Sequence, residues 1–195
     1  MKKIFYLFGL LLVVNSTISA NNSDEGVLIS GVRWATRNVD APGTFAANPE
    51  DAGQFYQWGR RQGWAAMDAV INWDSSASSG TNWMYVHDPC PTGWRIPTVD
   101  ELRSLRNAGS ERKTLNRVAG RLFGSAPNQI FLPATGWRLE HDGAHVNAGT
   151  NGYYWSNARS GSGFARYLGF LRDNVSLSGT NRAYGFSVRC VYIEL

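Results

Sequence analysis

The sequence predicts an α+β fold in which two helices pack on short antiparallel β-sheets connected by long loops. Three observations support this class. Apolar residues at spacings of three and four indicate two amphipathic helices, one beginning at Thr98 and one over residues 111–123. Short β-type runs separated by turns rich in Gly, Ser and Asn fill most of the remaining chain. The only two cysteines, Cys90 and Cys190, are expected to form one disulfide that ties the middle of the chain to its end.

The first helix has a well-defined start in the run 88–106. Pro97 disfavours helix in the residue before it, so the helix begins after this proline. Thr98 and Glu101 have the spacing of a capping box, in which each side chain bonds the backbone N–H of the other residue. The apolar stripe that this helix must bury consists of Val99, Leu102 and Leu105.

The second helix is predicted over residues 111–123, with Gly124 as its stop. Its apolar residues at spacings of three and four are Leu115, Val118, Ala119 and Leu122. The arginines on the opposite side are interpreted as a solvated charged face.

The strands are expected in short segments along the rest of the chain. Residues 27–29 and 32–36 predict a tight hairpin, and 55–61 an aromatic strand that ends at a glycine. Further strands are predicted over 129–133, 136–139, 153–156, 164–170, 174–177 and 185–193. Alternation in the segment 164–170 buries Leu168 and Phe170 and leaves Tyr167 pointing outward.

The N-terminus has the pattern of a secretory signal peptide over residues 1–20. Lys2 and Lys3 precede an apolar core that is shorter than the roughly 20 residues needed to span a bilayer. An uncleaved anchor helix is the alternative. We therefore expect an exported protein, extracellular, on the cell surface or in the periplasm, with a lead-in over 21–30 and one domain over 31–195.

The mature chain is nearly neutral. Without the two signal lysines, 17 basic residues face 15 acidic ones, so we expect no nucleic-acid partner. Lys113 is the only lysine after the signal, and all other basic residues are arginines. This bias fits either planar binding contacts or ordinary surface pairing.

A long loop with three tryptophans follows the aromatic strand. Trp64, Trp73 and Trp83 could stack on sugar rings, but the favoured interpretation is that they pin the loop onto the core. The later pair His141 and His145 lacks helical support and a third ligand, so we predict no metal site.

Six sequence blocks resemble, in the same order, those of the Fibrobacter succinogenes major paralogous domain family. They are 34–36 (WAT), 55–58 (FYQW), 90–98 (CPTGWRIPT), 132–138 (LPATGWR), 154–156 (YWS) and 185–190 (GFSVRC). The resemblance extends from about residue 31 to residue 193 and implies a C-type lectin-like fold.

The sequence favours a protein without catalysis. It contains no nucleophile elbow, zinc helix motif, phosphate loop or dinucleotide fingerprint. Within the superfamily, formylglycine-generating enzymes need reactive cysteines, whereas Cys90 and Cys190 are expected to serve structure. The segments with which calcium-dependent sugar binders ligate their cation are also missing, so the resemblance carries over no calcium and no other cofactor.

The main functional hypothesis is a secreted or cell-surface binding module for a protein or glycan. Its expected ligand surface has the Tyr, Asn, Ser and Arg mixture of antibody paratopes. The candidate residues are Tyr153, Trp155, Asn157, Arg159, Tyr167, Arg172, Asn174, Asn181, Arg182 and Tyr184. The resemblance also raises the hypothesis that residues 157–184 are diversified by a retroelement, although ordinary turns have the same composition. The alternative is a structural cell-surface or fimbria-associated domain, and a formylglycine-generating-like enzyme is a third, less favoured hypothesis.

Overall fold

The computed structural model describes residues 23–67 and 69–194. The expected signal peptide, residues 1–20, lies outside the described residues, as does the start of the lead-in. Within the described ranges, no helix is both long enough and apolar enough to cross a membrane.

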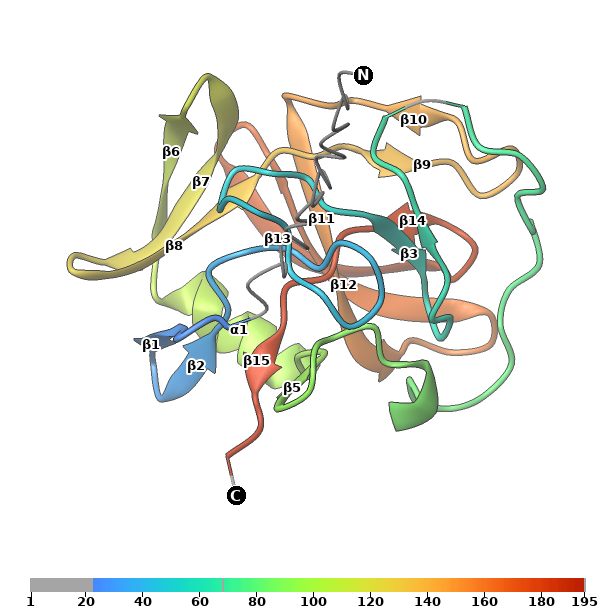
Figure 1. Ribbon diagram of the computed structural model, residues 1–195, viewed down its shortest axis with the longest axis horizontal. Coiled ribbons are helices and arrows are strands. Elements are labelled where there is room, and N and C mark those ends of the chain that lie inside the picture. Colours follow the sequence, from blue (N-terminus) through green and yellow to red (C-terminus); the bar gives the residue numbers. More distant parts are fainter. Residues whose placement is uncertain (1–22, 68, 195) are drawn as a thin grey trace, which may run out of the picture.

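Four antiparallel sheets make up most of the structure (Figure 1). The first contains, in spatial order, β1 (Val27–Ile29), β2 (Val32–Trp34), β15 (Val191–Tyr192) and β5 (Trp94–Arg95). The second contains β10 (His145–Val146), β9 (Trp137–Arg138), β14 (Gly185–Phe186), β3 (Phe55–Gln57) and β4 (Gly63–Trp64). The third contains β11 (Asn151–Arg159), β12 (Phe164–Leu171) and β13 (Asn174–Asn181). The fourth contains β6 (Ser110–Leu115), β7 (Val118–Ser125) and β8 (Asn128–Pro133).

The predicted α+β class with two helices is wrong, because the protein is mainly β and only 7% helical. Residues 111–123, expected to be a helix, instead form the β6–β7 hairpin, in which Leu115 pairs with Val118. Asn116 and Arg117 connect the strands and both have positive φ, 46° and 70°, as a two-residue hairpin turn requires. The apolar spacings of three and four that predicted a helix do not match the burial in this hairpin, where the buried residues of β7 are Arg121 and Phe123.

The first predicted helix is confirmed as α1 (Val99–Asn107), accompanied elsewhere by one 3-10 turn, η1 (Tyr85–His87). Thr98 Oγ1 accepts from the Glu101 N–H at 3.2 Å, and the Glu101 carboxylate accepts from the Thr98 N–H at 2.7 Å. Arg95 adds a two-pronged ion pair to the same carboxylate, at 2.8 and 2.6 Å. Leu102 and Leu105 are buried, so α1 presents the predicted apolar stripe to the core.

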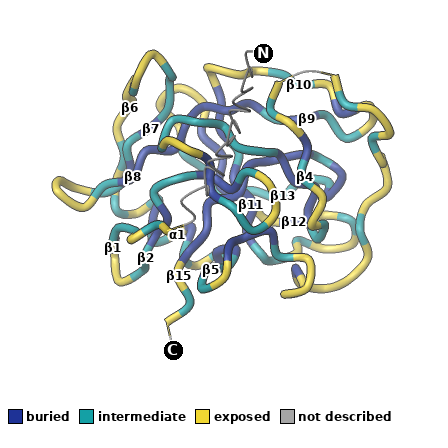
Figure 2. Tube along the Cα trace, in the orientation of Figure 1, coloured by how far each residue is buried: buried dark blue, intermediate teal, exposed yellow. Residues whose placement is uncertain are grey.

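The third sheet lies between two apolar clusters. On one face, Tyr154, Leu168 and Phe170 pack with the buried leucines of α1. On the other face, Trp155 and Ala165 join a cluster that includes residues of the second sheet. Leu168 and Phe170 are buried as predicted, but Ala165 and Gly169 on the opposite side of β12 are buried too, so the expected outward side is also covered. Figure 2 shows the buried segments gathered at the centre of the molecule.

The predicted disulfide is confirmed. Cys90 and Cys190 are bonded, with their Cα atoms 6.1 Å apart and a sequence separation of 100. The bond joins the segment before β5 to the segment before β15, two neighbouring strands of the first sheet. The predicted strand over 185–193 is divided, because β14 pairs in the second sheet and β15 in the first. Residues 187–190 therefore carry the chain between two sheets.

The tryptophan loop is pinned to the core, as the favoured interpretation predicted. Trp64 and Trp83 are 8% and 7% exposed. Trp73 packs against Trp64, with ring centroids 5.0 Å apart, and donates its indole N–H to the Glu140 carbonyl at 2.9 Å. These contacts hold in place a long segment that pairs with strands only near its two ends, at Trp64 and Asn82.

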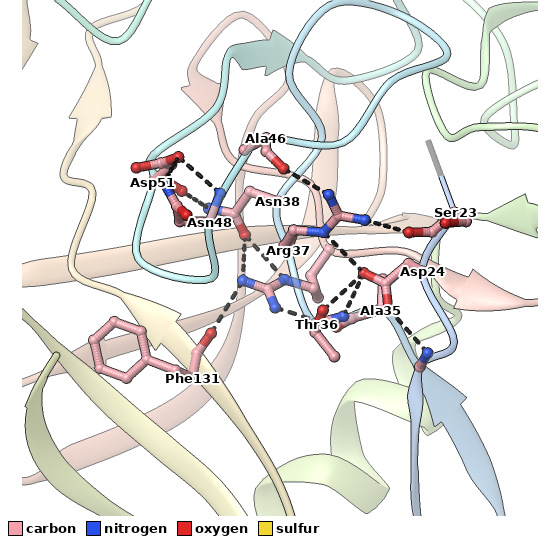
Figure 3. A network of polar contacts seen from close by, with 12 residues as sticks. Ser23, Asp24, Ala35, Thr36, Arg37, Asn38, Ala46, Asn48, Asp51 and Phe131 are labelled. Atoms are coloured by element: carbon pink, nitrogen blue, oxygen red, sulfur yellow. Dashed lines mark hydrogen bonds and ion pairs between the residues drawn. The ribbon is translucent and has the colours of Figure 1, made fainter. Parts of the chain in front are cut away.

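A buried arginine links the last segment to the first half of the chain. Arg189 is 1% exposed and donates to Asn38 Oδ1 at 2.8 and 3.0 Å, to the Ala35 carbonyl at 3.1 Å and to the Phe131 carbonyl at 3.0 Å. Figure 3 shows these acceptors converging from two parts of the chain, the segment with Ala35 and Asn38 and the strand with Phe131. Burial lowers the pKa of Arg189 to about 10.

Candidate functional site

Three of the predicted ligand residues come together on the face of the third sheet that packs toward the second sheet, beside the core cluster there. Tyr153 lies on β11, Tyr167 on β12 and Tyr184 in the turn before β14, and all three are half-buried. They pack around Phe186, whose ring centroid lies 5.0, 5.1 and 5.9 Å from theirs. The half-buried ring of Trp137 extends the group, 4.7 Å from Tyr153 at an interplanar angle of 71°. We call Trp137, Tyr153, Tyr167 and Tyr184 the aromatic face.

A glycine makes this arrangement of rings possible. Gly169 lies directly opposite Tyr153 in the β11–β12 pairing. A Cβ atom there would lie 2.8 Å from Tyr167 Cε2 and 3.3 Å from two ring atoms of Tyr153. Because real Cβ atoms are not found at the shorter distance, any larger residue would push the two rings apart.

The phenol hydroxyls of the aromatic face have polar partners. Asn151 Nδ2 donates to the Tyr153 hydroxyl at 3.2 Å. Burial raises the pKa of Tyr167, and a hydrogen bond with Ser178 partly opposes this shift. Burial also raises the pKa of Tyr184, and the neighbouring Glu140 carboxylate adds to the increase. These two hydroxyls therefore stay protonated at neutral pH and can both donate and accept hydrogen bonds.

Two of the predicted ligand residues belong to the core instead of the surface. Trp155 is fully buried and donates its indole N–H to the Tyr56 carbonyl at 2.7 Å. Arg182 is 4% exposed and lies over the ring of Trp58, with its guanidinium carbon 4.3 Å from the ring centroid. Its donors bond the carbonyls of Ser78, Gly80 and Phe164 at 3.1, 2.9 and 3.2 Å. Alternation along a strand does not reveal this burial, because both faces of the sheet are covered.

The remaining predicted residues lie near the two ends of the third sheet. Phe164 pairs with Asn181 at one end of the β12–β13 hairpin, and Leu171 pairs with Asn174 at the other. An eight-residue strand spans about 23 Å between its first and last residues. Arg172 and Asn174 therefore lie far from the end that carries Arg159, Asn181 and the C-terminal half of β11 with Asn157. The structure does not bring all ten residues into one site.

The sequence prediction missed Trp137, Glu140 and Ser178 as neighbours of the aromatic face. Ser178 could have been found by extending the predicted strand 174–177 by one residue. In that strand Val175 and Leu177 face one side, so alternation places Ser178 on the other side. Trp137 gave no local signal, because its position depends on the pairing of β9 with β14.

The histidine pair does not form a recognisable metal centre. The ring of His145 lies against Phe55, and its Nε2 lies 2.7 Å from the Thr135 carbonyl oxygen. His141 contacts the adjacent acids Glu140 and Asp142 on an exposed turn. Within the part of the chain that the structure describes, no three His, Cys, Asp or Glu side chains are grouped to hold a metal ion.

Comparison of the chain with protein-family models, with curated proteins and with solved structures found no significant match.

Proposed function

We propose that this protein is an exported, non-catalytic binding module and that the aromatic face holds a neutral glycan. The observation that carries the proposal is the clustering of four half-buried aromatic rings, three of which carry hydroxyls that lie beside other polar side chains. Flat ring surfaces suit the C–H faces of pyranose sugars, and phenol hydroxyls suit their hydroxyl groups. Export is compatible with the disulfide between Cys90 and Cys190.

The chemistry around the rings favours a glycan over an extended apolar partner. Ser178 and Glu140 contact the phenol hydroxyls, so polar acceptors lie beside the aromatic surface. Ser176 pairs with Gly169 across the β12–β13 ladder and so lies on the same side of the sheet. A surface of rings and small hydroxyl side chains can bond sugar hydroxyls while stacking on the ring.

The resemblance to the Fibrobacter succinogenes major paralogous domain family is kept as a proposal on its six sequence blocks. So is diversification of residues 157–184, which a near-identical template copy beside the gene would support. We do not propose a formylglycine-generating activity, because the two cysteines that it would need are bonded to each other.

The test is a glycan array followed by titration calorimetry with the mature protein. Tyr184→Ala is expected to weaken binding at least tenfold, which corresponds to about 1.4 kcal/mol. Gly169→Ala removes no ring but displaces two of them, and we expect it to weaken binding too. Tyr85→Ala, at a tyrosine that is 77% exposed on η1, is the matched control and should bind as the wild type does.

Two other results would replace this proposal. A protein captured from surface extracts through the same tyrosines, with no glycan bound on the array, would make a protein the ligand. No binding in either screen, from a protein that unfolds cooperatively, would favour the structural cell-surface domain.

A further inference from the structure

Two adjoining cavities lie on another part of the molecule, between the fourth sheet and the loops around it. The larger has a volume of about 730 Å³ and the smaller about 430 Å³. Both are lined by Ala119, Ala134 and Gly149, so the two hollows share a wall of very small residues. The two hollows therefore adjoin at these residues.

The smaller cavity is strongly basic. Arg112, Arg121 and Arg172 line it, and Asp173 is its one acidic residue. Arg112 and Arg121 are directly opposite each other in the β6–β7 hairpin, an arrangement in which like charges repel. Among the described residues, neither Arg112 nor Arg172 forms an ion pair with a carboxylate. The hollow therefore holds more positive charge than the protein itself neutralises.

The central guanidinium of this cavity is fixed in place. Arg121 is 7% exposed and donates to Ser110 Oγ at 3.0 Å, to the Ser110 carbonyl at 3.1 Å and to the Arg172 carbonyl. These backbone and hydroxyl acceptors orient the side chain without cancelling its charge. A planar guanidinium in a fixed position is well suited to bind an oxyanion, such as a carboxylate, sulfate or phosphate group.

The larger cavity is lined mainly by apolar surface. Its walls include Ala46, Ala52, Ala66, Val118 and Pro133, whose side chains are small and apolar. Its volume falls within the range of about 300–1,000 Å³ that is usual for small-molecule sites. Charged and titratable side chains also line this cavity, namely Asp40, Glu50, Asp51, Arg117 and His145, and Glu50 accepts from Asn116 Nδ2 at 2.6 Å. The anionic group of a ligand is therefore expected in the smaller, basic cavity and only an uncharged body in this one.

We infer that the two cavities form one site for a small amphipathic anion. Its oxyanion group lies among Arg112, Arg121 and Arg172. Its apolar body extends past the small residues that both cavities share and into the alanine-lined cavity. This site is separate from the aromatic face and does not depend on the proposed glycan.

The test uses titration calorimetry of the mature protein with octanoate, octyl sulfate and octyl phosphate below their aggregation concentrations. 1-Octanol represents the apolar body without a charged group, and inorganic sulfate represents the oxyanion group without an apolar body. We expect at least one octyl anion to bind tenfold or more tightly than either part, and the preferred head group identifies the oxyanion. The backbone N–H signals of Gly120 and Gly149 should shift in the NMR spectrum on binding, because both residues line the basic cavity.

Variants separate the two parts of the site. Arg112→Gln combined with Arg172→Gln should weaken octyl anion binding at least tenfold, whereas Arg166→Gln, at an exposed arginine of β12, should leave it unchanged. Ala66→Leu, which fills the apolar cavity, should weaken the octyl anion but not inorganic sulfate. The inference would be overturned if octanol bound as tightly as the octyl anions, or if inorganic sulfate bound as tightly as octyl sulfate. It would also be overturned if Arg166→Gln weakened binding as much as the double variant, or if no octyl anion bound.

Discussion

Arg189→Met is expected to lower the free energy of unfolding by about 3 kcal/mol. This value is the cost of lost hydrogen bonds minus the smaller gain from removing a buried charge. The loss arises because the guanidinium satisfies three buried acceptors, which are Asn38 Oδ1 and the carbonyls of Ala35 and Phe131. Each buried acceptor that loses its donor costs about 1–3 kcal/mol. Methionine fills a similar volume but offers no donor, so all three acceptors lose their partner.

The gain comes from removing a buried charge. Burial lowers the pKa of Arg189 from 12.5 to about 10, which corresponds to about 3 kcal/mol of cost in keeping the group charged. That cost disappears with the guanidinium. Subtracting it from the middle of the range for three lost acceptors leaves a net loss of about 3 kcal/mol, a large part of the 5–15 kcal/mol that typical domains have.

The measurement is urea unfolding followed by tryptophan fluorescence, with the free energy of unfolding taken from the midpoint and slope. Arg103→Met is the control, since Arg103 pairs with Asp100 on the exposed side of α1 and such pairs contribute about 0–1 kcal/mol. If Arg189→Met were as stable as the wild type, or more so, the desolvation cost of the guanidinium would exceed the value of its hydrogen bonds, and the reasoning would fail.

Three further predictions concern stability. Replacing Cys90 and Cys190 by serine should lower the free energy of unfolding by up to about 5 kcal/mol, since the closed loop contains about 100 residues; a loss under 1 kcal/mol in urea would contradict this. Burial would raise the pKa of Glu101, but the hydrogen bonds from Arg95 and Thr98 outweigh burial and hold it below 4.5. The stability from this pair is therefore present above that pH and is lost as pH falls through the lowered pKa, and Glu101→Gln should remove this dependence in acid titrations. Gly152→Ala should cost about 1–3 kcal/mol in thermal unfolding, because its Cβ would lie 2.3 Å from the Phe170 ring; an unchanged midpoint would show that the ring moves freely.

The elements that could be predicted were those fixed by local chemistry. The capping box of α1 depends on Thr98 and Glu101 alone, and a proline next to them leaves little choice for the start of the helix. The β6–β7 hairpin was missed because Asn116 and Arg117 lack the glycine that usually marks a two-residue turn. Its strands also lack clear alternation, since most of β6 is exposed and so is free of the pattern that burial imposes.

Only those residues of the candidate site whose orientation follows from alternation within one strand could be predicted from the sequence. Alternation in β12 brought Tyr167 into consideration, and its neighbour Tyr153 lies on the adjacent strand of the same sheet. Trp137 reaches the aromatic face through a pairing between strands far apart in the sequence, which no local pattern encodes. The basic cavity depends on the unexpected hairpin, because Arg112 and Arg121 face each other only when residues 111–123 form two strands.

The preference for arginine over lysine has a structural explanation in the buried arginines. Arg138, Arg182 and Arg189 are 1%, 4% and 1% exposed, and each donates to carbonyl groups of at least two separate segments. Long loops leave many carbonyls without strand partners, and an unsatisfied buried carbonyl is costly. A guanidinium has five donors in a fixed plane and can serve several of them at once, whereas an ammonium has three donors at one point. The buried arginines therefore hold loops to the core, whereas Arg112 and Arg172 remain exposed at the basic cavity, where we propose that the oxyanion binds.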